Sequence, residues 1–126
     1  MPTHQIVSLL LFACLASVVS AQVTLKKGAV VYLGSAANTT APAAVVEKKV
    51  RAATPEWQKI EYQSIDPGSA RGKQLISRMN ERIRKAVRSV ANSESHDLVT
   101  RKKDLKDARG RKVVELTDLV VRKIQE

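Results

Sequence analysis

Residues 87–124 have the sequence VRSVANSESHDLVTRKKDLKDARGRKVVELTDLVVRKI, in which several structural patterns follow one another. Apolar residues first recur at helical spacing up to Ala91. Residues 97–100 and 113–116 are short runs of the length and composition of strands, and the charged segment between them favours a loop. Residues 118–125 again have helical spacing, with Thr117 as the expected cap and Asp118 in the first turn. The order is therefore helix, strand, loop, strand and terminal helix.

A helix precedes this segment. Its apolar residues are spaced by three and four, which is the pattern of a helix with one buried face. They are Ile76, Met79, Ile83, Ala86 and Val90. Asp66-Pro67-Gly68-Ser69 is a turn signal, with Ser69 placed to cap the helix that follows.

A second apolar stripe lies before that turn. It consists of Val46, Val50, Ala53, Trp57 and Ile60, again spaced by three and four. Two stripes joined by a turn predict an antiparallel helical hairpin over residues 43–92, a shortened coiled-coil arm.

Pro55 interrupts the first arm and leaves two interpretations. Proline inside a helix removes one hydrogen bond, so the arm either kinks or a new helix begins with Thr54 as cap and Pro55 at its first position. Because the apolar phase continues past Pro55, the kink is preferred. Trp57 could anchor a client, but its place in the stripe favours packing inside the hairpin.

The amino-terminal part contains two further apolar runs. Residues 1–21 have the features of a secretory signal peptide cut after Ala21, although residues 1–5 contain no Lys or Arg. We therefore expect a periplasmic protein in which residues 22–126 form one domain. A lipoprotein signal at Cys14 is disfavoured, because Phe12 fits such a signal poorly and the apolar run continues beyond the cysteine. Residues 29–33 form an apolar run ended by Gly34, which predicts a strand.

The chain is strongly basic, with 22 Lys and Arg against 12 Asp and Glu, a formal net charge of +10. Such an excess favours anionic partners, among them nucleic acid, lipid head groups, lipopolysaccharide and acidic protein segments. Aromatic residues are few, at 3% of the chain. A large monomeric core is therefore not expected, and oligomerisation would supply the missing buried surface.

The clearest candidate binding surface is a basic stripe on the second arm. It consists of Arg71, Arg78, Arg82, Lys85 and Arg88. The ordinary explanation is the solvated face of a soluble helix. Between Arg71 and Arg88, however, seven basic residues face only one acid, Glu81, so pairing along the helix cannot balance the charge. The stripe therefore predicts a part of the protein that binds clients or anionic surfaces.

Other candidate sites are weaker. The basic run at residues 101–112 could contact nucleic acid, but no DNA- or RNA-binding motif accompanies it and the signal peptide argues against that partner. His96 lies beside Glu94 and Asp97, yet no other histidine or cysteine follows residue 21, so a metal site is not expected. Without a phosphate loop or nucleophile motif, we predict a protein that is not an enzyme and has no cofactor.

The carboxy-terminal motifs resemble the closing segment of the OmpH/Skp family of periplasmic chaperones. The similarity lies in Ala86-Val87 and Val90-Ala91, then Asp97-Leu98-Val99, then Leu116-Thr117-Asp118-Leu119-Val120. The resemblance implies an α+β, mainly helical fold in which a small β body carries helical arms and assembles into a homotrimer. In that plan strand 29–33 pairs beside the carboxy-terminal strands.

The resemblance also implies a function. We expect an exported, non-enzymatic holdase that binds unfolded outer-membrane or envelope proteins through apolar helix seams and a positive field. The alternative is a cationic structural envelope protein that binds anionic lipid or polysaccharide surfaces. The predicted arms are shorter than those of the best-known members, so a deep client cavity is not implied.

Overall fold

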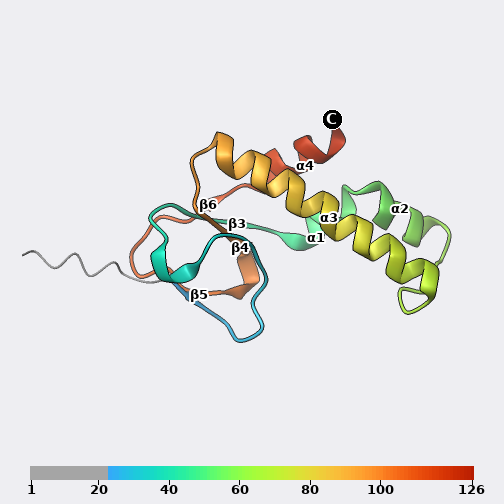
Figure 1. Cartoon of the computed structure of the whole chain (residues 1–126), viewed down its shortest axis with the longest axis horizontal. Coiled ribbons are helices and arrows are strands. Elements are labelled where there is room, and N and C mark those ends of the chain that lie inside the picture. The colour runs from blue at the N-terminus through green and yellow to red at the C-terminus, as the bar shows by residue number, and fades with distance from the viewer. Residues whose placement is uncertain (1–22) are drawn as a thin grey trace, which may run out of the picture.

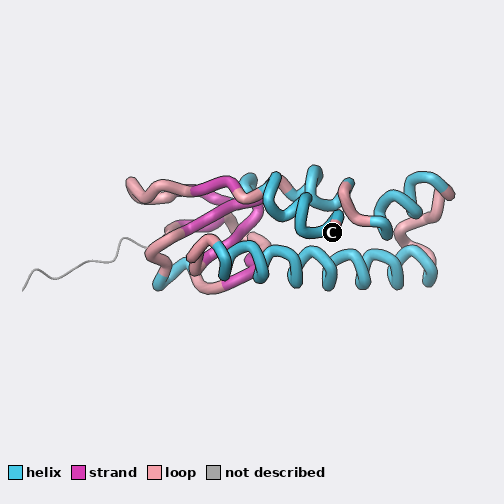
Figure 2. Tube along the Cα trace, turned by 90° about the horizontal axis from the view of Figure 1, so that it is seen from above, coloured by secondary structure: helices cyan, strands magenta, loops and turns pink. Residues whose placement is uncertain are grey.

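The protein has a mixed α/β fold in which small sheets are combined with four helices (Figure 1). The structure is a computed structural model that describes residues 23–126. The predicted signal peptide and the question of Cys14 lie outside the described residues. Figure 2 shows an elongated molecule with the strands at one end and helices along the rest of its length.

The main sheet contains four strands in the order β2-β4-β3-β6. They are β2 (Val31–Leu33), β3 (Pro42–Val45), β4 (Leu98–Arg101) and β6 (Val114–Glu115). β4 runs antiparallel to β2 and parallel to β3, and β3 is also parallel to β6. The predicted pairing of the amino-terminal strand with a carboxy-terminal strand is confirmed, because Val31 lies opposite Thr100.

A second, two-stranded ladder joins β1 (Thr24–Leu25) to β5 (Leu105–Asp107) in antiparallel orientation. This ladder extends the contact between the two ends of the described chain. The backbone amide of Lys26 also donates to the carbonyl of Asp104 at 2.8 Å.

The helical part consists of α1 (Glu47–Ala52), α2 (Pro55–Tyr62), α3 (Ala70–Ser93) and α4 (Thr117–Gln125). All helices between β3 and β4 belong to one crossover, which two parallel neighbouring strands require. α3 is by far the longest and runs along one side of the molecule, opposite the shorter helices (Figure 2). Its predicted cap is confirmed, since the Ser69 hydroxyl accepts from the amide of Gly72 at 3.0 Å.

The core lies between α3, α4 and one face of the sheet. Met79, Ile83 and Val87 of α3 pack there with Val45 and Val99 of the sheet. Residues alternate across a strand, so Ala44 and Leu98 point to the other face, where they are also buried. Among residues 23–126 only Tyr62 is a large apolar residue that is exposed, at 92%. The chain thus covers its own apolar surface more fully than its composition predicts.

The prediction of a helix from residue 43 is wrong, because residues 43–45 belong to β3. Short apolar runs fit a buried strand and a buried helix equally well, and the stripe that starts at Val46 favoured the helix. In the structure, Val46 instead ends the strand region and precedes α1. The backbone amide of Val46 is held by the Thr117 hydroxyl at 2.9 Å.

The predicted hairpin also differs, because its first arm is two short helices instead of one kinked helix. Thr54 is the cap of α2, its hydroxyl accepting from the amide of Trp57 at 3.3 Å, and Pro55 occupies the first position. The alternative interpretation of Pro55 is therefore the correct one. α1 and α2 have 6 and 8 residues against 24 in α3, so the first arm is much shorter than the second. Trp57 packs partly buried against the core, as its spacing predicted.

The carboxy-terminal segment is more ordered than predicted. The expected loop at residues 101–112 contains the end of β4, a 3₁₀ turn at Lys102–Asp104 and β5. Thr117 is not a helix cap, because its hydroxyl donates to Glu115 at 3.1 Å and accepts from Val46. The strands and terminal helix themselves match the predicted positions to within two residues.

Asp97, just before β4, fixes the segment that leads into β3. Its carboxylate accepts four hydrogen bonds of 2.6–3.0 Å, from the hydroxyls of Thr39 and Thr40 and from the amides of Thr40 and Ala41. Burial raises the pKa of Asp97, but these four donors outweigh it and hold the pKa far below its ordinary value. A group with a lowered folded pKa stabilises the fold above its unfolded pKa and loses that effect as pH falls.

We therefore expect Asp97→Asn to lower the free energy of unfolding at pH 7 by about 1–3 kcal/mol, because several donors lose a charged acceptor. The gap to the wild type should narrow as pH falls below about 4, the ordinary range of an aspartate. Urea unfolding between pH 7 and pH 2.5 measures both effects. Asp107→Asn is the control, since within residues 23–126 the Asp107 carboxylate accepts a single hydrogen bond, from the amide of Arg109, in an exposed turn. A gap that is independent of pH would contradict the assignment.

Candidate functional site: a basic groove along α3

A groove of about 700 Å³ runs along α3 where α2 and α4 approach it. Basic side chains of α3 and α4 line it, together with acidic side chains of α2, α3 and the last residue of the chain. The lining residues with charge are Glu56, Arg78, Glu81, Arg82, Lys85, Lys123 and Glu126. Three residues of the predicted basic stripe, Arg78, Arg82 and Lys85, therefore share one site.

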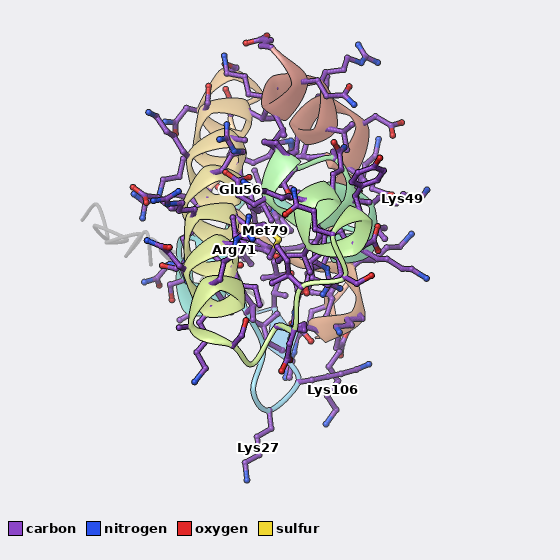
Figure 3. All side chains as sticks on the ribbon, turned by 90° about the vertical axis from the view of Figure 1, so that its right-hand side faces the viewer. Lys27, Lys49, Glu56, Arg71, Met79 and Lys106 are labelled. Carbon is purple, nitrogen blue, oxygen red and sulfur yellow. The ribbon has the colours of Figure 1, made fainter. Side chains whose placement is uncertain are left out.

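Arg82 has a structural partner that the α3 sequence does not show. Its Nε donates to both carboxylate oxygens of Glu56 at 3.0 Å, and its Nη2 donates to Oε1 at 2.9 Å. Glu56 is only 8% exposed, while the Arg82 side chain is 45% exposed. Figure 3 shows Glu56 between α3 and the shorter helices. The pair thus holds α2 against α3.

The electrostatics of Glu56 follow from this pair. Burial raises the pKa of Glu56, while the hydrogen bonds and the charge of Arg82 lower it. The lowering is larger, so the pKa of Glu56 lies below its ordinary value. Glu56 therefore stays ionised at neutral pH. It balances Arg82 within the groove.

The remaining groove cations differ in how they are balanced. Lys123 on α4 pairs with Glu126 at 2.9 Å. Arg78 and Lys85 form no ion pair within residues 23–126, and Glu81 on the same helix forms none there either. The groove thus has a small positive excess, with Arg78 and Lys85 as the cations available to a ligand.

The other two predicted site residues lie outside the groove. Arg71, nearer the start of α3, donates to the side-chain carbonyl of Gln63 at 3.1 Å. Arg88 is exposed, and its side chain has no hydrogen bond or ion pair with any residue of the described part of the chain. Lys123 joins the groove from α4, and sequence spacing on α3 could not reveal it.

The exposed flank of α3 nevertheless carries four basic side chains, with Glu81 as the one acid among them. Arg71, Arg78 and Lys85 repeat every seven residues, and Arg88 follows one turn later, so they lie in a row about 25 Å long at 1.5 Å per residue. We call these four residues the basic row. Across residues 23–126, Arg82 is the sole basic residue of α3 with an ion pair.

The apolar face of α3 is not available beside this row. Met79, Ile83, Val87 and Val90 are buried in the core of the chain itself. A client could not contact this seam without opening the fold.

The second basic cluster is largely occupied by internal pairs. Arg101 binds Asp104 and Glu47, the latter at 2.8 Å, and Lys102 pairs with Glu115 at 3.1 Å. Part of the charge at residues 101–112 is therefore used in ion pairs that stabilise the fold. These contacts give no added support to nucleic-acid binding.

His96, considered above as a metal ligand, contacts a backbone carbonyl group. The Nδ1 atom of His96 lies 3.1 Å from the carbonyl of Ala41. Within residues 23–126, His, Cys, Asp and Glu side chains form no group of three or more that could hold a metal ion. Over the same residues, no helix has both the length and the apolar character needed to cross a membrane.

Comparison with known proteins gives no match. No protein-family model, no curated protein and no solved structure is significantly similar to this chain.

The Arg82–Glu56 pair predicts unequal roles for neighbouring arginines. Arg82→Met keeps the apolar stem but leaves the buried Glu56 carboxylate without its partner, so we expect unfolding at pH 7 to become easier by about 1–3 kcal/mol. Arg78→Met, the matched control, should change the free energy of unfolding by less than about 0.5 kcal/mol. Urea titrations of the three proteins measure this.

The effect should also depend on pH. Since the folded pKa of Glu56 is lowered, its contribution is present above the unfolded value of about 4.3 and is lost below it. The difference between wild type and Arg82→Met should therefore shrink at pH 3. Equal stabilities of the two Met variants at pH 7 would contradict a structural role for Arg82.

Proposed function

We propose that this protein is an exported, non-enzymatic binder of anionic lipid surfaces of the cell envelope, and that the basic row of α3 makes the contact. The observation that supports this most strongly is the combination on one helix of a buried apolar face and a row of cations without ion pairs in residues 23–126. A partner of α3 would therefore meet positive charge and not apolar surface. The net charge of +10 acts in the same direction.

The dimensions of the row fit a surface of many phosphates. A row of about 25 Å exceeds the screening length of about 8–10 Å at ordinary salt, so its cations act on several head groups instead of one. Each basic residue near an anionic membrane contributes about 1 kcal/mol of attraction. Phospholipid and lipopolysaccharide share this phosphate chemistry.

The proposal predicts that Arg78→Gln/Lys85→Gln binds anionic vesicles about 30-fold more weakly, because two contributions of about 1 kcal/mol each are removed. Co-sedimentation with vesicles of anionic phospholipid, and separately with vesicles that contain lipopolysaccharide, measures this and distinguishes the two lipid sources. Affinity should fall steeply as salt rises, and neutral vesicles should not bind.

Lys27→Gln/Lys106→Gln is the matched control. It removes the same charge at the far end of the molecule, where Figure 3 shows both side chains pointing away from the body. We expect a loss of less than about threefold in this variant, since the field of two distant charges is screened at the row. Equal losses in the two double variants would contradict a localised binding surface.

A holdase of OmpH/Skp type is the second candidate. It is supported by the pairing of β2 with β4 in one sheet, which agrees with the strand arrangement that the resemblance implies. Against it stands the burial of the α3 seam, so unfolded envelope proteins would be held by the basic row and the exposed Tyr62. The predicted homotrimer is part of this second candidate. The expected lack of buried apolar surface supports it less than the sequence suggested, because one chain already buries its own core.

Suppression of aggregation of a denatured outer-membrane barrel protein tests the holdase. Strong suppression that is lost as salt rises, together with a native mass of three chains, would favour it over the lipid binder. Lipid binding without suppression would reject it.

A further inference from the structure

A second cavity, of about 270 Å³, lies on the opposite flank of α3 from the basic groove. Asn80, Ile83 and Arg84 of α3 form one side. The other sides come from Val30 and Tyr32 at β2, Glu47 and Arg51 of α1, and Arg101 at the end of β4. Segments that are far apart in the sequence therefore converge here.

Tyr32 gives this cavity an unusual polar group. The residue is only 8% exposed, and its hydroxyl, which is not fully buried, forms no hydrogen bond with any group of the described chain. Burial, and then the nearby Glu47 carboxylate, raise the pKa of Tyr32 to about 12. The hydroxyl therefore keeps its proton at neutral pH and is available as a donor.

The charges around the cavity leave one guanidinium in excess. Arg101 binds both Glu47, at 2.8 Å, and Asp104, and Arg51 lies 3.7 Å from Glu47. These two carboxylates compensate Arg51 and Arg101. Arg84 is exposed at the cavity and has no ion pair within residues 23–126, so its charge is not compensated there.

More positive charge lies beside the cavity, and contact with an aromatic ring fixes the orientation of Arg51. The guanidinium of Arg51 stacks over Trp57, 4.6 Å from the ring centre, which fixes its orientation. A neighbouring hollow shares Glu47, Arg51 and Arg101 and adds three lysines. They are Lys48, Lys102 and Lys103.

From this arrangement we propose that the cavity is a binding site for a small organic oxyanion, a phosphate monoester or a carboxylate with a short apolar group. Arg84 and the Tyr32 hydroxyl would donate to the anion, since guanidinium groups match the geometry of phosphate and carboxylate oxygens. Val30, Met79 and Ile83 form an apolar wall for the organic part. A volume near the lower limit of ligand pockets, about 300 Å³, restricts the site to a small ligand.

This site is independent of the lipid-binding proposal, because it is on the other flank of α3 and takes a soluble ligand. Titration calorimetry of the full chain with monobutyl phosphate, butyrate and inorganic phosphate at constant ionic strength tests it. We expect saturable binding of one molecule per chain for at least one of the two organic anions. The comparison between them shows whether phosphate or carboxylate is preferred, and butanol serves as the neutral control.

Two variants localise the site. Arg84→Gln should weaken binding about tenfold or more, and Tyr32→Phe several-fold, because a charged donor and a hydroxyl donor are lost. Lys73→Gln, about three turns earlier on α3 and outside the basic row, changes the net charge equally and should leave affinity within about twofold of the wild type. Tyr32→Phe should unfold at the same urea concentration as the wild type, since the hydroxyl has no bond to lose within the described residues.

The outcomes are decisive even if Tyr32→Phe folds poorly, because Arg84→Gln and Lys73→Gln are both exposed substitutions on the same helix. Strong weakening by the first alone supports the site. Absence of saturable binding for both organic anions, or equal weakening by the two glutamine variants, would overturn it.

Discussion

The position of β4 between β2 and β3 is the constraint on which the rest of the structure depends. Leu98, Val99 and Thr100 are all fully buried, and the strand is paired along both edges. Both of its neighbours come from the amino-terminal part of the described chain, so β4 joins the two ends of that chain. It also fixes where α3 ends and therefore which of its faces is buried.

Charged residues at the two ends of β4 extend this constraint to the neighbouring segments. Asp97 before the strand binds residues 39–41, which lead into β3. Arg101 at its end binds Glu47 at the start of α1 and Asp104, whose carboxylate accepts from the amide of Val30 at 2.9 Å. A strand whose two ends hold three other segments links packing, charge pairing and the shape of the Tyr32 cavity.

The division of α3 into faces follows from this arrangement and determines what the molecule can present to a partner. The buried face supplies the core, one flank carries the basic row, and the other flank meets the sheet at the Tyr32 cavity. Apolar contact with a partner is limited by burial, while positive charge is not. For this reason the expected partners are anions, an extended lipid surface at the basic row and a small molecule in the Tyr32 cavity.

Much of the fold could be predicted from local pattern. The strands near 31, 98 and 114 are short apolar runs, the helices α3 and α4 have helical periodicity, and the Ser69 cap has a clear chemical signal. β3 could not be distinguished from helix, because Ala43-Ala44-Val45 is apolar at every position. Continuous phase across Pro55 hid the break between α1 and α2, since phase reports which face is buried and not whether the backbone is continuous.

The candidate site was predictable only along one helix. Spacing on α3 identifies Arg78, Arg82 and Lys85 as neighbours. It could not show that Glu56 neutralises Arg82, because that contact joins residues 26 positions apart in different helices. Nor could it reveal the Tyr32 cavity, which requires the tertiary arrangement of β2, α1, α3 and β4. Long-range pairing, not local propensity, determines which charges remain available.

Native-state hydrogen exchange of the β4 amides tests the central claim most directly. If β4 is the buried centre of the sheet, the amides of Val99 and Thr100 exchange only through global unfolding, with the same protection as Val87 in the middle of the α3 core. Exchange at these two amides that is faster by orders of magnitude, while Val87 stays protected, would show that the sheet does not hold the two ends of the chain together.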